Sequence, residues 1–451
     1  MNKPFPEIAA YLSDHRDQII ADLMELVRYP SISRAGKDGL PFGKEVDDVL
    51  NAAADMFHRY GISMDVRHEH GYAVGGLDGI GDGIGIFGHA DVVPVNDDWV
   101  KTTPFEPIEE NGFLYGRGIS DNKAGVIASL YALLALKAVG KEPKSRITVY
   151  VGGSEETGMQ DLEAFVKNER MPAVSLVPDS GFPLSVGEKG ILRVNCTSKK
   201  PLRDVKKLDG GKAYNVILDK VDVALANGET FVVKGLTSHA SNPDGSINAA
   251  QKAAEQLLEM PICEEDKLIL DGMRAVIADY FGGAVGIASC GVFGNLTSAN
   301  GISRVLDDGR LYFTLDIRYG SETNLSIMAP AMTAALDRFG FEMEVHEDDP
   351  GFLLDENGRE MEIVLNTCRA CGNKPEAMPF KMGGGTYARK LRNAFAISHS
   401  LPLMDAKPEL PAGHGGAHQS DEVLNTENLL GGIWAIACMI AGLDDYLIEG
   451  I

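Results

Sequence analysis

Three short apolar runs of the sequence are each followed by side chains that can bind a metal ion or accept a proton. In chain order these are His89 with Asp91, Glu155 with Glu156, and Asp179. Imidazole nitrogens and carboxylate oxygens without thiolates suit zinc, manganese or cobalt. A divalent cation held by such residues lowers the pKa of a water molecule and prepares it to attack a carbonyl group. The residue types therefore point to metal-assisted hydrolysis.

His89 and Asp91 occupy alternate positions at an expected strand end, so their side chains point to the same side. A carboxylate there can accept a hydrogen bond from the imidazole and fix its tautomer, as the partners of metal-bound histidines commonly do. Taken alone, the pair is more typical of a buried core histidine. Its meaning therefore depends on the other motifs.

Asp121 lies in the glycine-rich segment Gly116–Gly125, just before an apolar helical stretch. Aspartate is a favoured helix cap, and for this segment alone the structural interpretation is the stronger one. The flanking glycines, however, allow the backbone to come close to whatever Asp121 binds.

Glu155 and Glu156 are adjacent, and they follow an expected strand that contains no acidic residue. Two neighbouring carboxylates repel each other unless a cation is near. In a surface loop the pair would mean little, but at a strand end it allows a division of labour. One glutamate would be a metal ligand and the other a general base.

His418 precedes the last expected helix, and like Asp179 it could be structural when considered alone. Together the candidate metal ligands are His89, Asp121, Glu156, Asp179 and His418. This set suits a paired site for zinc, manganese or cobalt in which Asp121 bridges two cations.

The elements that must position these residues alternate between helices and buried strands. Apolar spacing predicts helices over 8–26, 46–60 and 123–139, and strands over 84–87, 147–151 and 174–177. Such alternation predicts a mostly parallel sheet, and the ligands of such sheets gather at the carboxyl ends of the strands. Because three of the motifs follow the three strands, they should meet at one edge of the sheet.

Beyond about Gly190 the pattern changes to alternating strands with separate helices, and the parallel pattern resumes near Met382 with a helical stretch from Thr386. A chain of 451 residues also exceeds what one core usually organises. We therefore expect an α/β fold of two domains. Residues 1–189 and 377–451 would form a mostly parallel-sheet catalytic domain, and residues 190–376 an inserted α+β domain.

The formal net charge of −23 argues against nucleic acid or a membrane as partner. Met1–Gln18 contains no apolar core segment, so we expect no secretory signal and a cytoplasmic location. The uncharged run Leu429–Leu443 is too short to span a membrane, which favours a buried core helix. Six irregularly spaced cysteines fit a reducing compartment, and Cys368 and Cys371 are expected to be ordinary thiols.

The order of the motifs resembles that of the M20 family of metallopeptidases over nearly the whole chain. Within that family the sequence is most similar to bacterial dipeptidases of the PepV and Sapep type. The segments that carry this finer resemblance are Ala213–Val216, Ser238–Ser241, Asp316–Tyr319 and Gly383–Arg389. One departure is that Val216–Asp219 lacks the proline expected there. This affects the expected loop geometry and leaves the metal ligands unchanged.

The resemblance implies a zinc-peptidase-like catalytic domain with two divalent cations per chain. Zinc is the first expectation, with manganese or cobalt as alternatives. His89 and Asp179 would hold one cation, Glu156 and His418 would hold the other, and Asp121 would bridge the two.

By the same resemblance, Glu155 would be the general base and Asp91 would orient His89. The inserted domain would act as a lid, with His239 stabilising the oxyanion. Asn215 and Arg318 would contact the substrate, and an arginine can pair bidentately with a free carboxylate. Backbone N–H groups of a glycine run could bind the same carboxylate. That run comprises Gly383, Gly384 and Gly385.

The implied activity is metal-dependent hydrolysis of dipeptides. The implied oligomeric state is a monomer, because the larger lid of these dipeptidases resembles a built-in substitute for a partner subunit. The same metal core would also serve an amidase acting on N-acyl amino acids, or a carboxypeptidase. A non-catalytic binding protein with this fold would be expected to lack a ligand or the base, and here all of them are present.

Overall fold

The computed structural model describes residues 4–37 and 39–450. Its contacts divide the chain into two compact units. Unit 1 consists of Met1–Val186, Leu354–Phe380 and Thr386–Ile451, and unit 2 consists of Gly187–Leu353 and Lys381–Gly385. Compared with the expected domain ranges, the largest difference concerns residues 354–376. These belong to unit 1 because helix α9 (Arg359–Cys371) packs against helix α10 (Thr426–Glu449).

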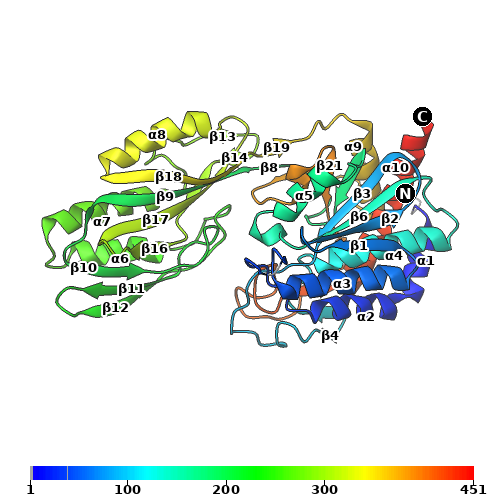
Figure 1. The fold of residues 1–451 in the computed structure, drawn as a ribbon, viewed down its shortest axis with the longest axis horizontal. Helices are drawn as coiled ribbons and strands as arrows, with labels where there is room; N and C mark the ends of the chain where they lie inside the picture. Colours follow the sequence, from blue (N-terminus) through cyan, green and yellow to red (C-terminus); the bar gives the residue numbers. More distant parts are fainter. Residues whose placement is uncertain (1–3, 38, 451) are drawn as a thin grey trace. The chain divides into compact units, whose positions relative to one another are not determined.

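Unit 1 is built on a twisted mixed sheet (Figure 1). Its strand order is β1-β2-β6-β3-β7-β21-β8, in which β6, β3, β7 and β21 run parallel and the flanking pairs are antiparallel. The bounds are β1 Ser63–Arg67, β2 Tyr72–Leu77, β3 Ile80–His89, β6 Ser145–Gly152, β7 Val174–Val177, β8 Leu184–Glu188 and β21 Ala394–Ile397. The expected α/β fold is confirmed, with parallel pairing confined to the centre of the sheet.

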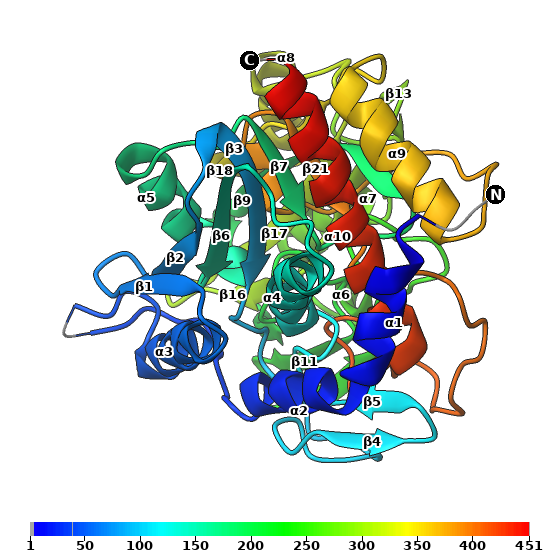
Figure 2. The same ribbon diagram turned by 90° about the vertical axis from the view of Figure 1, so that its right-hand side faces the viewer.

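Helices cover both faces of this sheet because its central strands are apolar on both sides. On one face, α4 (Lys123–Ala138) and α10 pack on each other and on β3, and α1 (Pro6–Asp14) and α2 (Arg16–Val27) pack against α4. On the other face, Phe165 of α5 (Gln160–Asn168) contacts the rings of Phe87 and Tyr150. Figure 2 shows α1, α2, α4 and α10 on one side of the sheet and α5 on the other.

Two further helices of unit 1 agree with the apolar spacing of the sequence. Helix α3 (Lys44–Arg59) buries one stripe, including Val46, Leu50 and Phe57, against β1 and β2. Helix α10 is long and apolar enough, by length and composition, to cross a membrane. Its apolar residues, however, lie in the core of unit 1, as expected for a buried helix of a folded domain.

Smaller elements complete unit 1. A three-stranded sheet joins β22 (Val423–Asn425), β5 (Phe113–Tyr115) and β4 (Ile108–Glu110). The helix expected from Thr386 is only a short 3₁₀ turn, η2 (Tyr387–Lys390), which Thr386 caps. It stops there because β21 begins at Ala394 and must return to the sheet.

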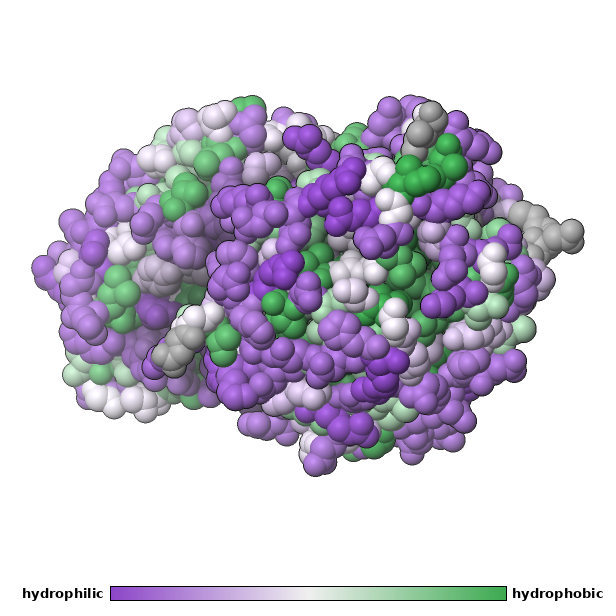
Figure 3. Space-filling view, turned by 45° about the vertical axis from the view of Figure 1, so that its right-hand side comes forward, coloured by the Kyte–Doolittle hydropathy of each residue, from purple (hydrophilic) through white to green (hydrophobic). Residues whose placement is uncertain are grey.

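The face drawn in Figure 3 is mostly hydrophilic, which fits the charged composition.

Unit 2 is an α+β arrangement with its own apolar core. Its larger sheet has the antiparallel order β15-β17-β9-β18, with β16 beside β17, and a second sheet has the order β10-β11-β12. The bounds are β9 Gly190–Pro201, β10 Val205–Asp209, β11 Lys220–Leu225, β12 Thr230–Lys234, β15 Thr297–Ala299, β16 Ser303–Val305, β17 Arg310–Tyr319 and β18 Phe341–Asp349. Helices α6 (Ala249–Leu258), α7 (Glu264–Ile277) and α8 (Leu325–Arg338) complete it.

Two short hairpin strands, β13 (Cys290–Gly291) and β14 (Gly294–Asn295), also belong to unit 2. Strand β8 runs from unit 1 into unit 2, where its last residues pair with β19 (Phe352–Leu353). Strand β20 (Phe380–Met382) pairs with β8 and leads to the glycine run at 383–385. The glycine run therefore belongs to unit 2, whereas Thr386 belongs to unit 1.

Candidate metal centre

The ends of the parallel strands in unit 1 bring the predicted residues together. His89 is the last residue of β3 and pairs with Gly152, the last residue of β6. The chain then turns into η1 (Glu155–Thr157), which carries both glutamates. Asp179 follows the end of β7 by two residues. Because β3 lies between β6 and β7, these three side-chain groups converge at one edge of the sheet.

The five predicted metal ligands form one continuous cluster. The Nε2 atom of His89 lies 3.1 Å from Asp121 Oδ1 and 3.6 Å from Asp179 Oδ2. On the other side, His418 Nε2 lies 3.1 Å from Asp121 Oδ2 and 3.0 Å from Glu156 Oε1. Each carboxylate oxygen of Asp121 therefore faces a different imidazole.

The predicted base also belongs to this cluster. Candidate ligand atoms of His89, Asp121 and Glu156 lie within 4.8 Å of one another, and so do those of His89, Glu155 and Asp179. Glu155 therefore stands on the side of the cluster that His89 and Asp179 form. Burial raises the pKa of Glu155 well above the usual range, although the charge of His89 opposes this. A raised carboxyl pKa suits a group that must both accept and release a proton.

The donor atoms fit divalent cations. Ligands held at about 2.0–2.2 Å from a zinc ion at tetrahedral angles lie about 3.3–3.6 Å apart, near the separations found here. Glu156 Oε1 is buried, and although it lies 3.0 Å from His418 Nε2, the two atoms are not aligned as in a regular hydrogen bond. A cation bound to both Glu156 Oε1 and His418 Nε2 would satisfy these two atoms.

The charge of the cluster favours cations as well. Within the described residues of unit 1, the buried lysine and arginine side chains are Arg117 and Lys123. They stand against a larger group of acidic side chains: Asp91, Asp121, Glu155, Glu156, Asp161, Asp179 and Glu422. Carboxylates in such surplus are costly to bury unless a cation offsets their charge.

The two imidazoles respond to this surplus. Burial lowers the pKa of His89, but hydrogen bonds with Asp121 and Asp91 outweigh it and raise that pKa well above its usual value. For His418, burial also opposes the change, and contacts with Asp121 and Glu156 raise the pKa to about 11. An imidazole must be neutral to bind a metal ion. A bound cation would therefore replace the protons that the carboxylates otherwise hold on the two imidazoles.

Asp91 lies where the sequence led us to expect it, and it also makes contacts that were not foreseen. Its carboxylate Oδ1 is 3.4 Å from His89 Nδ1, and its main-chain oxygen is 3.1 Å from the same nitrogen. The carboxylate also accepts the main-chain N–H groups of Glu155, at 3.1 Å, and of Glu156, at 3.2 Å. Asp91 thereby connects the imidazole to the turn that carries both glutamates.

Several supporting residues were not assigned a role from the sequence. Asn122 donates through Nδ2 to Asp179 Oδ1 at 2.8 Å and to the Pro178 carbonyl at 2.7 Å. Asn122 sits beside Asp121 in the glycine-rich motif, so its position in that motif was the available signal. One of these hydrogen bonds holds the Asp179 carboxylate directly, and the other holds the backbone just before it.

Asp161, in helix α5, supports the turn that leads to Glu155 and Glu156. Its Oδ2 accepts the N–H groups of Gly153, at 2.7 Å, and Ser154, at 3.0 Å, and the hydroxyl of Tyr387 at 2.6 Å. Gly152 must be glycine here, because an added Cβ would lie 1.8 Å from the Tyr387 hydroxyl oxygen. Asp161 is one of 65 acidic residues in the sequence, and no local pattern distinguishes it.

The residues predicted to stabilise the oxyanion and to bind the substrate lie in unit 2. His239 Nδ1 is 2.7 Å from Ser241 Oγ, and the Asn215 carbonyl accepts the N–H of Ala240 at 2.9 Å. Elsewhere in the unit, Arg318 donates through Nη1 to the Gly383 carbonyl at 3.2 Å. The structure therefore pairs the His239 loop with the Asn215 segment, and Arg318 with the glycine run.

Arg318 is also held by Asp316, two residues earlier in β17. Its Nη2 donates to Asp316 Oδ2 at 3.1 Å and its Nε donates to Asp316 Oδ1 at 2.5 Å. Both side chains are buried, and their opposite charges offset each other. A second guanidinium, that of Arg193, reaches Asp316 Oδ2 at 3.4 Å.

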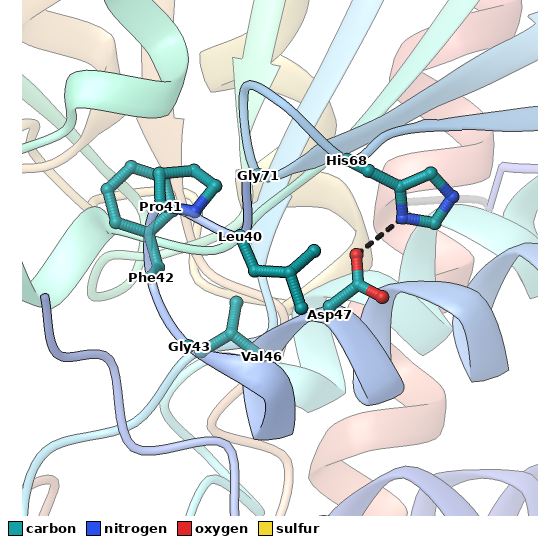
Figure 4. A pocket seen from close by; sticks show the side chains of 8 residues that line it. All are labelled: Leu40, Pro41, Phe42, Gly43, Val46, Asp47, His68 and Gly71. Atoms are coloured by element: carbon teal, nitrogen blue, oxygen red, sulfur yellow. Dashed lines mark hydrogen bonds and ion pairs between the residues drawn. The ribbon is translucent and has the colours of Figure 1, made fainter. Parts of the chain in front are cut away.

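A separate shallow pocket of unit 1 contains none of the predicted residues (Figure 4). In it, His68 Nδ1 lies 2.5 Å from Asp47 Oδ1. The remaining lining residues are Leu40, Pro41, Phe42, Gly43, Val46 and Gly71. This apolar pocket with a single imidazole–carboxylate pair offers no second metal centre.

Known proteins resemble this chain in sequence and in fold. The sequence model of Peptidase family M20/M25/M40 matches residues 85–441. A protein of Staphylococcus aureus (strain MRSA252) named "Putative dipeptidase SAR1836" is 26% identical over 444 residues, which cover 88% of this chain and 94% of that protein.

Two solved structures share the fold. Human carnosine dipeptidase 1 superposes with a TM-score of 0.65 at 16% identity, covering 98% of each chain. The M20 family metallo-carboxypeptidase Sso-CP2 from Sulfolobus solfataricus superposes with a TM-score of 0.60 at 17% identity, covering 95% of this chain and 99% of that one. At these identities the two structures establish the fold alone.

Proposed function

Because the chain belongs to peptidase family M20/M25/M40, and is a hydrolase that acts as a peptidase, we propose that it is a metal-dependent dipeptidase. The observation that carries this proposal is the position of Asp121, whose two carboxylate oxygens face His89 and His418 at 3.1 Å each. A carboxylate shared in this way is suited to bridge two cations.

Two divalent cations would be held by the clustered ligands. His89 and Asp179 would hold one, Glu156 and His418 the other, and Asp121 would belong to both. Zinc fits this set of nitrogen and oxygen donors, and manganese or cobalt share the same preferences. When bound, such cations lower the pKa of a water molecule and polarise the scissile carbonyl group.

Glu155 would act as the general base. It accepts a proton from the attacking water and later donates that proton to the amine nitrogen that leaves. Asp91 keeps this carboxylate in place by holding the main-chain N–H groups of both glutamates. It also contacts His89 Nδ1, which leaves Nε2 for ligation.

The residues of unit 2 would recognise the substrate. His239 would stabilise the oxyanion, and Asn215, Arg318 and the glycine run at 383–385 would bind the rest of the dipeptide. Support comes from the fixed position of the Arg318 guanidinium, which Asp316 and the Gly383 carbonyl hold. A guanidinium held in this way recognises a carboxylate with little further loss of side-chain freedom.

The names of relatives also support dipeptides as the substrate class. The S. aureus relative and the human structure are both named as dipeptidases, whereas Sso-CP2 is named as a carboxypeptidase. We further propose that the chain works as a cytoplasmic monomer on small peptides. Its molar mass in solution, measured by light scattering, would reveal a dimer if this is wrong.

A substrate panel tests the proposal. The metal-loaded protein would be assayed with dipeptides, tripeptides and N-acetyl amino acids, and kcat/KM compared. Dipeptides should be preferred, because a dipeptidase must recognise both the free amine and the carboxylate. Preference for N-acetyl amino acids would instead identify an amidase, and preference for tripeptides a peptidase of longer substrates.

A further inference from the structure

Glu422 is a buried carboxylate beside the metal cluster that is not one of its ligands. Its Oε2 accepts from Arg117 Nη1 at 2.7 Å and from the Gly118 N–H at 3.1 Å. Its Oε1 accepts the N–H groups of Ser120, at 2.8 Å, and of Asp121, at 2.9 Å. Both oxygens are thus occupied by donors, so neither is left to bind a cation or to accept a proton from water.

Arg117 extends this contact to His418. The guanidinium is buried, and its Nη2 donates to the main-chain carbonyl of His418 at 3.2 Å. It also lies over the ring of Trp99, with 5.6 Å between the guanidinium carbon and the ring centroid. The Gly116 N–H donates to the main-chain oxygen of Glu422 at 3.1 Å. One buried ion pair therefore joins the segment that carries Asp121 to the turn that carries His418.

The backbone of the His418 turn needs such support. His418 has φ of 65° and Asp421 has φ of 53°, both in the left-handed region that side chains other than glycine rarely adopt. Conformations of this kind persist only where the surroundings fix them. The Arg117 contact to the His418 carbonyl, and the contacts of Glu422 just after the turn, are such fixing interactions.

The consequence concerns one half of the metal cluster. The distance between Asp121 Oδ2 and His418 Nε2, 3.1 Å, depends on two segments about 300 residues apart in sequence. Glu422 and Arg117 connect those two segments directly. By contrast, His89 and Asp179 are placed by β3, β7 and Asn122, without this ion pair.

We infer that Glu422 and Arg117 are positioning residues that fix Asp121 relative to His418 and so retain the cation held by His418 and Glu156. The inference rests on the proposed two-cation site. It predicts an asymmetric effect, because weakening the ion pair should loosen one cation and leave the cation of His89 and Asp179 in place.

The test is cobalt binding to the full chain, followed by visible absorption and by metal analysis after dialysis. Glu422→Gln keeps the shape of the side chain but offers only one acceptor oxygen to four donors. Loss of a group that orients metal ligands typically weakens affinity about 10–100-fold. One of two cobalt ions should therefore bind about 10–100-fold more weakly, and turnover should recover when the metal concentration is raised.

Two companion variants sharpen this test. Arg117→Lys keeps the charge but cannot contact both Glu422 and the His418 carbonyl as a guanidinium does, so it should weaken the same site even if Glu422→Gln does not fold. His418→Asn removes a ligand of that site directly. The cobalt spectra of the ions that remain in the three variants should coincide.

Asp444→Asn is the matched control. Asp444 is another buried carboxylate of unit 1 and accepts the N–H groups of Lys144, at 3.0 Å, and Ser145, at 2.7 Å, on another part of the fold. It should lower the melting temperature while both cobalt sites keep their affinity. A merely structural role for Glu422 would give the same result as this control.

The possible failures are distinguishable. If folded Glu422→Gln and Arg117→Lys bind both cobalt ions as the natural protein does, or lose both equally, the positioning role is overturned while the metal site stands. If the natural protein itself binds no cobalt, the proposed metal site is wrong and the inference falls with it.

Discussion

Buried charge is arranged differently around Asp121 in unit 1 and around Arg318 in unit 2. Around Asp121, carboxylates outnumber the buried cationic side chains, which among the described residues of unit 1 are Arg117 and Lys123. Around Arg318, the guanidinium is matched by Asp316 at 2.5 Å and 3.1 Å. A surplus of carboxylates favours divalent cations, whereas a neutral pair leaves a guanidinium in a fixed position for hydrogen bonding.

This difference suggests two separate tasks. Residues of unit 1 should determine whether any peptide bond is cut, and residues of unit 2 should determine which substrate is accepted. Variants around Asp121 should then lose turnover of every substrate. Variants around Arg318 should lose turnover only of substrates that present a particular group.

The largest effect is expected for Glu155→Gln, which removes the proposed base but keeps a side chain of the same shape. General acid–base groups typically contribute 10²–10⁴-fold, so kcat should fall by about that factor for every substrate. Metal analysis should find as much bound cation as in the natural protein. Glu163→Gln, at an exposed position of α5, is the control and should keep normal turnover. Near-normal turnover of Glu155→Gln would show that another group is the base.

A smaller and selective effect is expected for Arg318→Lys. Hydrogen bonds to charged groups contribute about 1.5–3 kcal/mol, so kcat/KM for dipeptides with a free carboxylate should fall about 10–100-fold. Dipeptide amides, which lack that carboxylate, should be turned over as by the natural protein. Arg310→Lys on the same strand, where the arginine pairs with Asp308 at 2.7 Å, is the matched control. An equal loss for acids and amides would remove Arg318 from carboxylate recognition.

The smallest effect is expected at the pocket drawn in Figure 4. The side chains of its His68–Asp47 pair are partly exposed, and pairs of this kind contribute about 0–1 kcal/mol to stability. His68→Ala should therefore leave kcat, substrate preference and bound metal unchanged, with a free energy of unfolding within about 1 kcal/mol of the natural value. A loss of turnover on this substitution would mean that the chemistry extends beyond the surroundings of Asp121 and Arg318.

Much of unit 1 could be predicted because its signals are local. His89, Glu155 and Asp179 lie at or just after the ends of apolar strands, and the parallel centre of the sheet brings them together as expected. The antiparallel edges were not foreseen, because the sequence of a short strand such as β2 does not indicate whether the strand pairs parallel or antiparallel. The helix expected from Thr386 was wrong because the return of the chain into β21 limits it to one turn.

The supporting contacts could not be predicted from one sequence. Glu422 and Arg117 are 305 positions apart, and Glu422 acts mainly by accepting main-chain N–H groups, which every residue except proline offers. Asp161 acts in the same way on Gly153 and Ser154. Such roles depend on the three-dimensional arrangement, so neither residue type nor spacing predicts them.

The proposed function requires that the chain hydrolyse dipeptides only when the ligands around Asp121 hold divalent cations. The most direct measurement removes bound metal with a chelator and follows dipeptide turnover as zinc or manganese is returned. We expect the stripped protein to be inactive and to regain turnover at about two equivalents of cation per chain. Full turnover in a stripped protein in which metal analysis finds no bound cation would contradict the account.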